Sequence, residues 1–148
     1  MNAELVSVLL VEDDPGDVLL IREAFADHKV GNVLSVVSDG VEAMRYLRGE
    51  GDYAGRERPD LILLDLNLPR KNGAEVLAEI KRDQSLATIP VIVLTTSDAE
   101  EDVMRSYRLH ANAFITKPVD FERFREIVHR IDDFFIGIVK LPPRTPSA

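Results

Sequence analysis

Five short apolar runs recur along the chain, and a stretch with helical spacing of apolar residues follows each of them. Nearly continuous apolar runs are typical of parallel strands covered on both faces, because a strand with one exposed face alternates apolar and polar residues. Five strand–helix units in succession predict an α/β domain with a doubly wound, five-stranded parallel sheet. The expected strands are 6–11, 33–37, 61–64, 91–95 and 113–116. The first expected helix begins at Pro15 with Asp14 as its N-cap, and the third begins near Asn72. The second, fourth and fifth are expected at about Gly40 to Arg48, Asp98 to Leu109 and Asp120 to Phe135.

Length and charge limit the classes of protein to consider. The chain has 148 residues, which predicts one compact domain at 1–135 followed by an extension at 136–148 and no output domain. The formal net charge of −8 argues against nucleic acid as a partner. The first residues lack the basic flank of a signal peptide and the length of a membrane span, so we expect a cytoplasmic protein that does not enter a membrane.

Acidic side chains stand where two of the predicted strands end. Glu12 and Asp13 follow the first strand, and Asp65 follows the third. Because the carboxyl ends of parallel strands meet at one edge of a sheet, these carboxylates are expected to converge there. The fourth and fifth strands lead to hydroxyl groups and one ammonium at the same edge, on Thr95, Thr96 and Lys117.

A cluster of carboxylates needs a counter-charge. Two carboxylates about 4 Å apart repel each other by about 4 kcal/mol at an effective dielectric constant near 20. Mg²⁺ would relieve this repulsion, because it takes oxygen ligands and commonly binds through one or two carboxylates and a phosphate oxygen. Asp65 would then be a nucleophile that accepts a phosphoryl group, with Thr95 and Lys117 contacting the phosphate oxygens. The plainer alternative makes Asp65 a strand-end cap or the partner of Lys117 in a salt bridge, and the whole constellation favours the phosphoacceptor.

The segments that carry these residues resemble the receiver domain of two-component response regulators. The similarity spans residues 5–132 through "VLLVEDDP", "LILLDLNLPRKNG", "VIVLTTSDAEED" and "ANAFITKPVDFERF". The resemblance implies a flavodoxin-like (βα)5 fold and phosphorylation of Asp65 by a sensor histidine kinase. It also implies a Mg²⁺ site formed by Asp13, Asp65 and the main-chain carbonyl of Asn67, with Glu12 acting through water. Thr95 and Lys117 would contact the phosphate, and Thr95 and Phe114 would take part in a conformational switch. Two alternatives stay open: Thr96 could bind phosphate through its backbone N–H or simply begin a helix, and Phe114 could instead be a core residue.

Two departures from the commonest receiver pattern indicate a particular subgroup of receiver domains. Arg70, Lys71 and Asn72 stand where a hydrophobic residue and an Asp often occur, and 49–60 is a long polar insertion that we expect to be exposed. Together with the ending "FFIGIVKLPP", these features resemble the stand-alone receivers that partner bacterial phytochrome histidine kinases. A kinase of that type is therefore the expected partner.

The predicted fifth helix carries a broad apolar stripe that has two interpretations. Its residues could extend the core against the sheet, or they could form an exposed patch for a homodimer. The sequence does not decide between the two. The residues expected at a dimer or partner surface are Phe121, Phe124, Phe134, Phe135 and Ile138.

Two other classes of protein share parts of this pattern. A phosphatase with an aspartyl intermediate commonly has a second Asp two residues after its nucleophile, and this chain has Asn67 there. A flavin-binding module needs a phosphate cradle of Ser, Thr and Gly after the first strand, where this chain has Glu12 and Asp13. Both alternatives fit less well than a phosphoacceptor.

Overall fold

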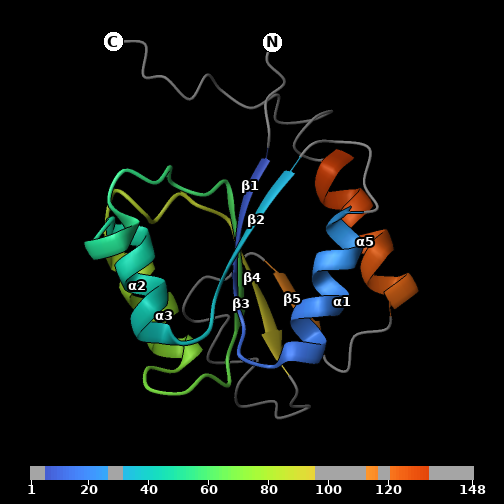
Figure 1. Cartoon of the computed structure of the whole chain (residues 1–148), viewed down its shortest axis with the longest axis horizontal. Helices are drawn as coiled ribbons and strands as arrows, with labels where there is room; N and C mark the ends of the chain where they lie inside the picture. Colours follow the sequence, from blue (N-terminus) through green and yellow to red (C-terminus); the bar gives the residue numbers. More distant parts are fainter. Residues whose placement is uncertain (1–5, 27–31, 96–112, 117–120, 134–148) are drawn as a thin grey trace.

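In the computed structural model of the chain, a five-stranded parallel sheet lies between two layers of helices (Figure 1). The structure describes residues 6–26, 32–95, 113–116 and 121–133. The strand order is β2-β1-β3-β4-β5, which is the flavodoxin-like order and confirms the predicted sheet. The elements are β1 (Val6–Val11), α1 (Pro15–Ala26), β2 (Asn32–Val37), α2 (Gly40–Arg48), the 3₁₀ turn η1 (Gly51–Tyr53), β3 (Leu61–Asp65), α3 (Gly73–Arg82), β4 (Val91–Thr95), β5 (Ala113–Thr116) and α5 (Phe121–Asp133).

The bounds predicted from the apolar pattern of the sequence agree closely with the observed bounds of most elements. The observed β1, β4, β5 and α2 have the predicted bounds, and β2 and β3 differ from the prediction by one residue at one end. The helix predicted at 98–109 lies outside the described residues.

The core has two halves, one on each face of the sheet. Alternate residues of the central strands point to opposite faces: Leu9 and Leu64 pack towards α2 and α3, whereas Leu10 and Leu63 pack towards α1 and α5. All four side chains are fully buried. Burial on both faces explains why these strands are apolar at nearly every position.

Polar residues at helix N-termini fix where the loops at the carboxyl edge of the sheet end. The Asp14 carboxylate accepts a hydrogen bond from the backbone N–H of Asp17 at 2.8 Å, as expected for an N-cap before Pro15. Asn72 and Glu75 form a reciprocal capping box at the start of α3. The loops that follow β1 and β3 therefore end at defined residues.

The prediction that Phe124 in α5 belongs to a dimer surface is wrong. The Phe124 side chain is 0% exposed, and its ring lies edge-on to that of Phe25 in α1, with 6.2 Å between the centroids. Phe124 is therefore a core residue of the single chain and is unavailable to a partner, because α1 and the sheet already cover it. Phe121 is partly buried against the same half of the core. Phe134, Phe135 and Ile138 lie outside the described residues.

The 49–60 insertion is largely exposed, as predicted, but specific contacts hold it on the domain. The guanidinium of Arg58 donates a hydrogen bond to the Thr88 hydroxyl at 2.7 Å. The carboxylate of Asp60 accepts a hydrogen bond from the Ser7 backbone N–H at 2.8 Å. These contacts tie the insertion to the loop before β4 and to the start of β1.

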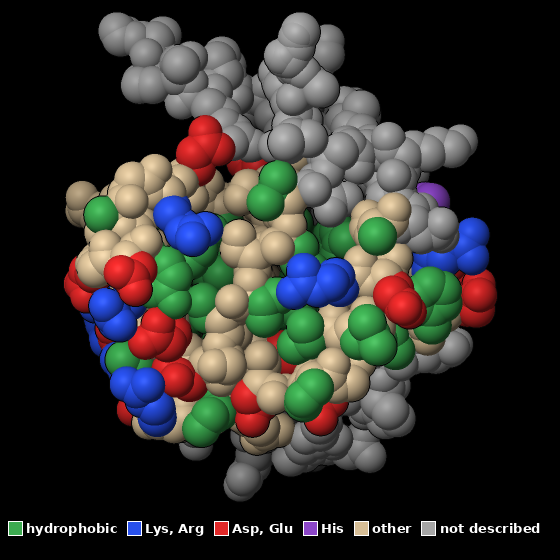
Figure 2. Space-filling model, in the orientation of Figure 1, with side chains coloured by type: hydrophobic (Ala, Val, Ile, Leu, Met, Phe, Trp, Pro, Cys, Tyr) green, Lys and Arg blue, Asp and Glu red, His purple; other side chains and the backbone are tan. Residues whose placement is uncertain are grey.

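The described surface mixes charges of both signs. On the face drawn in Figure 2, the Lys and Arg side chains of the described residues are interspersed with Asp and Glu and form no single basic patch. Among the described helices, none has the length and apolar character needed to cross a bilayer.

Candidate functional site

Strand register brings Glu12 and Asp65 side by side. Val11 in β1 pairs with Leu64 in β3, and Glu12 and Asp65 are the next residue of each strand path. The Glu12 backbone N–H donates to the Val37 carbonyl at 3.0 Å, so Glu12 continues the ladder between β1 and β2. The side chains of Glu12 and Asp65 therefore emerge at the carboxyl edge of adjacent central strands.

Asp13 completes a cluster of three carboxylates. One oxygen atom from each of Glu12, Asp13 and Asp65 lies within 4.8 Å of the other two. Glu12 is 1% exposed and Asp65 is 2% exposed, whereas Asp13 is open to solvent. The predicted convergence of acidic side chains is thus present in the fold, with two carboxylates in the protein interior and one at its surface.

Backbone N–H groups hold the two buried carboxylates. The Asn67 N–H donates to Asp65 Oδ1 at 3.1 Å, and the Asp14 N–H donates to Glu12 Oε2 at 3.1 Å. Hydrogen bonds to an ionised acceptor are stronger than neutral ones and partly offset the cost of burying charge. Both donors lie two residues beyond their acceptors, so short local turns orient the acidic oxygens.

The cluster has the composition of a site for a hard divalent cation. Three carboxylates in this space repel one another, and each offers the oxygen ligands that Mg²⁺ and Mn²⁺ prefer. A bound cation would offset the repulsion among these three carboxylates. The residues present therefore fit the metal that the sequence predicts.

Comparison with known proteins identifies the family. The family described as "Response regulator receiver domain" matches residues 8–129. The chain is a response regulator receiver domain. Response regulator Rcp1 from Synechocystis sp. is 45% identical over 135 residues, which cover 91% of this chain and 92% of Rcp1.

Two crystal structures are similar to the receiver over almost its whole length. The phosphorylated cyanobacterial phytochrome response regulator RcpA is 50% identical with a TM-score of 0.85, and the match covers 94% of this chain and 99% of RcpA. The Mn²⁺-bound form of Rcp1 is 44% identical with a TM-score of 0.82, covering 93% of this chain and 99% of that one. The resemblance to receivers of phytochrome systems is confirmed.

The remaining predicted site residues of the receiver lie on β4, β5 and the segments that follow. Asp65 pairs with Leu94, and Thr95 is the next residue of β4 and pairs with Thr116 of β5. The backbone of Thr95 therefore lies at the same edge as the acidic cluster. The structure describes Thr95 and Phe114 by backbone alone, and Thr96 and Lys117 lie outside the described residues.

Asp39 was not among the predicted site residues, and Arg70 was predicted only to depart from the family pattern. In the structure, Arg70 Nη1 lies 3.1 Å from Asp39 Oδ2, and this ion pair joins the start of α2 to the loop after β3. The Asp-Gly pair before a helical pattern was an available signal for an N-cap at Asp39. No local pattern indicates its pairing with Arg70, because the two residues are 31 positions apart.

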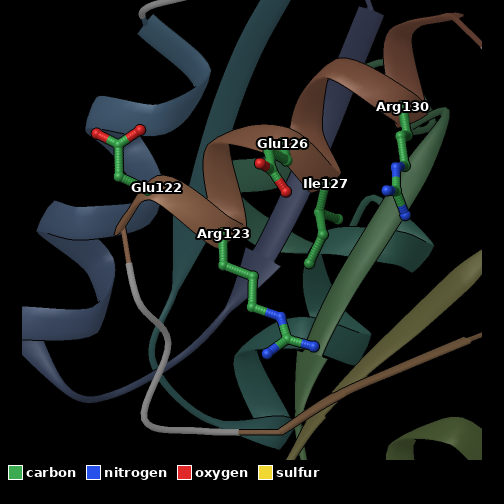
Figure 3. A pocket seen from close by; sticks show the side chains of 5 residues that line it. All are labelled: Glu122, Arg123, Glu126, Ile127 and Arg130. Atoms are coloured by element: carbon green, nitrogen blue, oxygen red, sulfur yellow. The ribbon is translucent and has the colours of Figure 1, made fainter.

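The receiver also has a pocket of about 480 Å³ along α5, lined by Glu122, Arg123, Glu126, Ile127 and Arg130. Figure 3 shows the side chains of Arg123, Ile127 and Arg130 leaving the same side of the helix. Ligand pockets for small molecules are mostly apolar, whereas four of the five lining residues here are charged. No residue of the acidic cluster lines this pocket, so it plays no part in the candidate metal site.

Proposed function

We propose that Asp65 of this receiver accepts a phosphoryl group from a sensor histidine kinase, with Mg²⁺ as the cofactor. The observation that carries the proposal is the approach of Glu12 and Asp13 to within 4.8 Å of Asp65 at the end of a fully buried strand. Burying a carboxylate costs free energy unless hydrogen bonds and a cation compensate its charge.

Four residues would hold the metal. Asp13, Asp65 and the main-chain carbonyl of Asn67 would be direct ligands, and Glu12 would act through a bound water. The Mn²⁺-bound form of Rcp1, at 44% identity, supports a divalent cation in this fold. When bound, Mg²⁺ supplies positive charge to the phosphoryl oxygens as the phosphoryl group transfers.

Groups of the protein orient the Asp65 carboxylate and neutralise the charge on the phosphoryl oxygens during the transfer. An oxygen of Asp65 attacks the phosphorus of the kinase phosphohistidine; a P–O bond forms, the P–N bond breaks, and the imidazole leaves with the electron pair. The Asn67 N–H holds the Asp65 carboxylate in place at 3.1 Å. Lys117 neutralises a phosphoryl oxygen, and the Thr95 hydroxyl and Thr96 N–H donate hydrogen bonds to the others.

Hydrolysis returns the receiver to its resting state. Water attacks the phosphorus of the acyl phosphate, inorganic phosphate leaves, and the Asp65 carboxylate is restored. The domain thus assists its own phosphorylation and dephosphorylation without converting an external substrate. Asn67 occupies the position of a phosphatase's acid/base Asp, which is consistent with a signalling role.

Phosphorylation would change the surface formed by the predicted fourth helix at 98–109, β5 and α5, and this change would signal to a partner. Thr95 would move towards the new phosphoryl group, and Phe114 would occupy the space that it leaves. Shifting such an equilibrium from 1:99 to 99:1 requires about 5.5 kcal/mol of differential stabilisation. The charged pocket on α5 lies on the surface that this change would alter.

The expected partner is a histidine kinase of the phytochrome type. The similarity to RcpA and Rcp1, at 50% and 45% identity, supports this choice over other sensor kinases. The kinase's ATP and phosphohistidine are cytoplasmic, so the receiver would act in the cytoplasm. We also infer a homodimer in which Phe121 and the residues Phe134, Phe135 and Ile138 contribute apolar surface.

Labelling with acetyl phosphate or a phosphorylated phytochrome kinase tests the proposal. Asp65→Asn should abolish Mg²⁺-dependent labelling, because an amide cannot form the acyl phosphate. Asp14→Asn is the matched control: Asp14 is a neighbouring exposed carboxylate that caps α1, and Asn caps equally well. Labelling that persists in Asp65→Asn would exclude Asp65 as the phosphoacceptor.

A further inference from the structure

The loop between β3 and α3 contains a strained turn. The Lys71 N–H donates to the Pro69 carbonyl at 2.8 Å, which closes a three-residue turn around Arg70. Arg70 has φ of +67° and is the one residue other than glycine with a positive φ in the described part of the chain. For a residue with a Cβ, this conformation costs about 1–2 kcal/mol. Such a conformation persists only where surrounding contacts enforce it.

The carboxylate of Asp39 supplies one of these contacts. Asp39 Oδ2 accepts a hydrogen bond from Arg70 Nη1 at 3.1 Å, and Asp39 Oδ1 accepts one from the Glu42 N–H at 2.8 Å. The Asp39 side chain is 10% exposed and is already fixed as the N-cap of α2. The ion pair therefore orders one side chain rather than two, which favours it over an ordinary surface pair.

The start of α2 and the helix α3 hold the same loop from the other side. A Cβ at Gly40 would overlap the Lys71 carbonyl, whose carbon would be 2.7 Å away, so α2 begins in direct contact with the loop backbone. The Lys71 ammonium pairs with Glu79 of α3, and Glu79 also pairs with Arg48 of α2 at 3.3 Å. The loop therefore contacts both α2 and α3, which lie side by side on one face of the sheet (Figure 1).

The other end of this loop forms the proposed metal site. Asn67, whose carbonyl is a proposed ligand, is three residues before Arg70 and donates its N–H to Asp65. The loop has few ways to adjust between these points, because Pro69 restricts φ and the turn at Arg70 is closed by a hydrogen bond. A change of backbone conformation at Arg70 would therefore be passed along the loop towards Asn67.

We propose that Arg70, held by Asp39, is a positioning residue that aims the Asn67 carbonyl at the cation. This inference rests on the proposed function, because it assigns a role towards the metal of that site. It also explains why α2, which supplies no proposed ligand, begins in contact with the loop that does.

The test measures Mg²⁺ affinity by calorimetry and, separately, the free energy of unfolding in urea without Mg²⁺. Arg70→Ala and Asp39→Asn should each weaken Mg²⁺ binding about tenfold, as expected for loss of a group that orients a ligand. Asn still caps α2, so Asp39→Asn removes the charge partner of Arg70 and leaves the helix start intact. The double variant should bind no more weakly than either single variant, because both remove the same contact.

Two further variants separate positioning from general stability. Arg70→Gly relieves the strain at positive φ but lacks the guanidinium, and it should bind Mg²⁺ as weakly as Arg70→Ala. Arg45→Ala breaks an ion pair with Glu42 within α2, outside the contacts that hold the loop, and it should leave Mg²⁺ affinity unchanged. A purely structural role for Arg70 would lower the free energy of unfolding and leave the Mg²⁺ affinity of the folded protein within twofold of wild type. That result would overturn the proposal.

The wild-type protein separates this inference from the proposed function. If the wild type binds no Mg²⁺ and Asp65 is not labelled, the proposed function itself is wrong. If the wild type binds Mg²⁺ and is labelled, and Arg70→Ala matches it within twofold in affinity, only the positioning role is wrong.

Discussion

Gly73 packs its Cα directly against the main chain of Asp65. A Cβ at position 73 would overlap the Asp65 carbonyl oxygen and lie 2.6 Å from the Leu66 Cα, and the Gly73 N–H donates to the Leu66 carbonyl at 3.0 Å. The first residue of α3 is therefore in contact with the end of β3. This close approach leaves the backbone around the proposed phosphoacceptor little freedom to move.

Gly73→Ala should disturb both stability and the metal site. The added methyl group meets backbone atoms, which cannot rotate away as a side chain could, so we expect a loss of about 2 kcal/mol in the free energy of unfolding. Mg²⁺ affinity should also fall, because Asp65 and Asn67 must shift to make room. Urea unfolding and calorimetry measure the two effects. Gly16→Ala is the control: its nearest neighbour would be an Asp14 carboxylate oxygen at 3.3 Å, and Ala is the better helix former.

Asp13→Asn should stabilise the metal-free protein and weaken its response to Mg²⁺. Removing one charge relieves repulsion with Glu12 and Asp65, and at the solvent-exposed position of Asp13 this is worth about 1 kcal/mol at low salt. The increase in unfolding free energy on adding Mg²⁺ should become smaller, because the affinity falls. Urea unfolding with and without Mg²⁺ measures both. A metal-free Asp13→Asn protein less stable than wild type would contradict mutual repulsion within the cluster.

Tyr53 should make stability fall at high pH. A hydrogen bond from its hydroxyl to Glu42 at 2.7 Å, followed by burial and the Glu42 charge, raises the pKa of Tyr53 above its usual value near 10. The unfolded chain loses this proton first, so the stabilisation is complete below pH 10 and decreases as pH rises through the raised pKa of the folded protein. Unfolding free energies measured from pH 8 to 11 should show this decrease.

Tyr53→Phe should lower the unfolding free energy at pH 7 by about 1 kcal/mol, because solvent partly screens this hydrogen bond. The variant should also lose the part of the alkaline decrease that Tyr53 causes. Glu42→Gln keeps the tyrosine and should bring the pKa of Tyr53 down towards 10, as followed by phenolate absorbance. If Glu42→Gln leaves the pKa of Tyr53 unchanged, Glu42 is not the reason why that pKa is raised.

Phe124→Ala should be strongly destabilising, whereas Phe121→Ala should act mainly on association. Phe124 is fully buried against Phe25, and truncation of such a side chain costs about 3–5 kcal/mol. Phe121 is only partly buried, so its truncation should cost less and should shift any dimer formed with beryllofluoride and Mg²⁺ towards monomer. Urea unfolding and analytical ultracentrifugation measure these outcomes. A dimer that is unchanged by Phe121→Ala would exclude Phe121 from the interface.

The sequence by itself determined the α/β class, the strands and the acidic edge. Apolar runs such as 61–64 are visible locally, because burial on both faces requires an apolar side chain at nearly every position. The rule that parallel strands present their carboxyl ends together was enough to expect Glu12, Asp13 and Asp65 at one edge. Helix starts were also predictable where the cap is local, as at Asp14.

Only the tertiary structure decided which side chains from distant segments meet. It placed Glu12 beside Asp65 through the β1–β3 register, paired Asp39 with Arg70, and turned Phe124 into the core against Phe25. An apolar stripe on a helix has the same sequence pattern whether a sheet or a second molecule covers it, so the pattern could not assign Phe124. Contacts of this kind depend on the packing of whole layers, and a local sequence pattern carries no information about the partner on the other side.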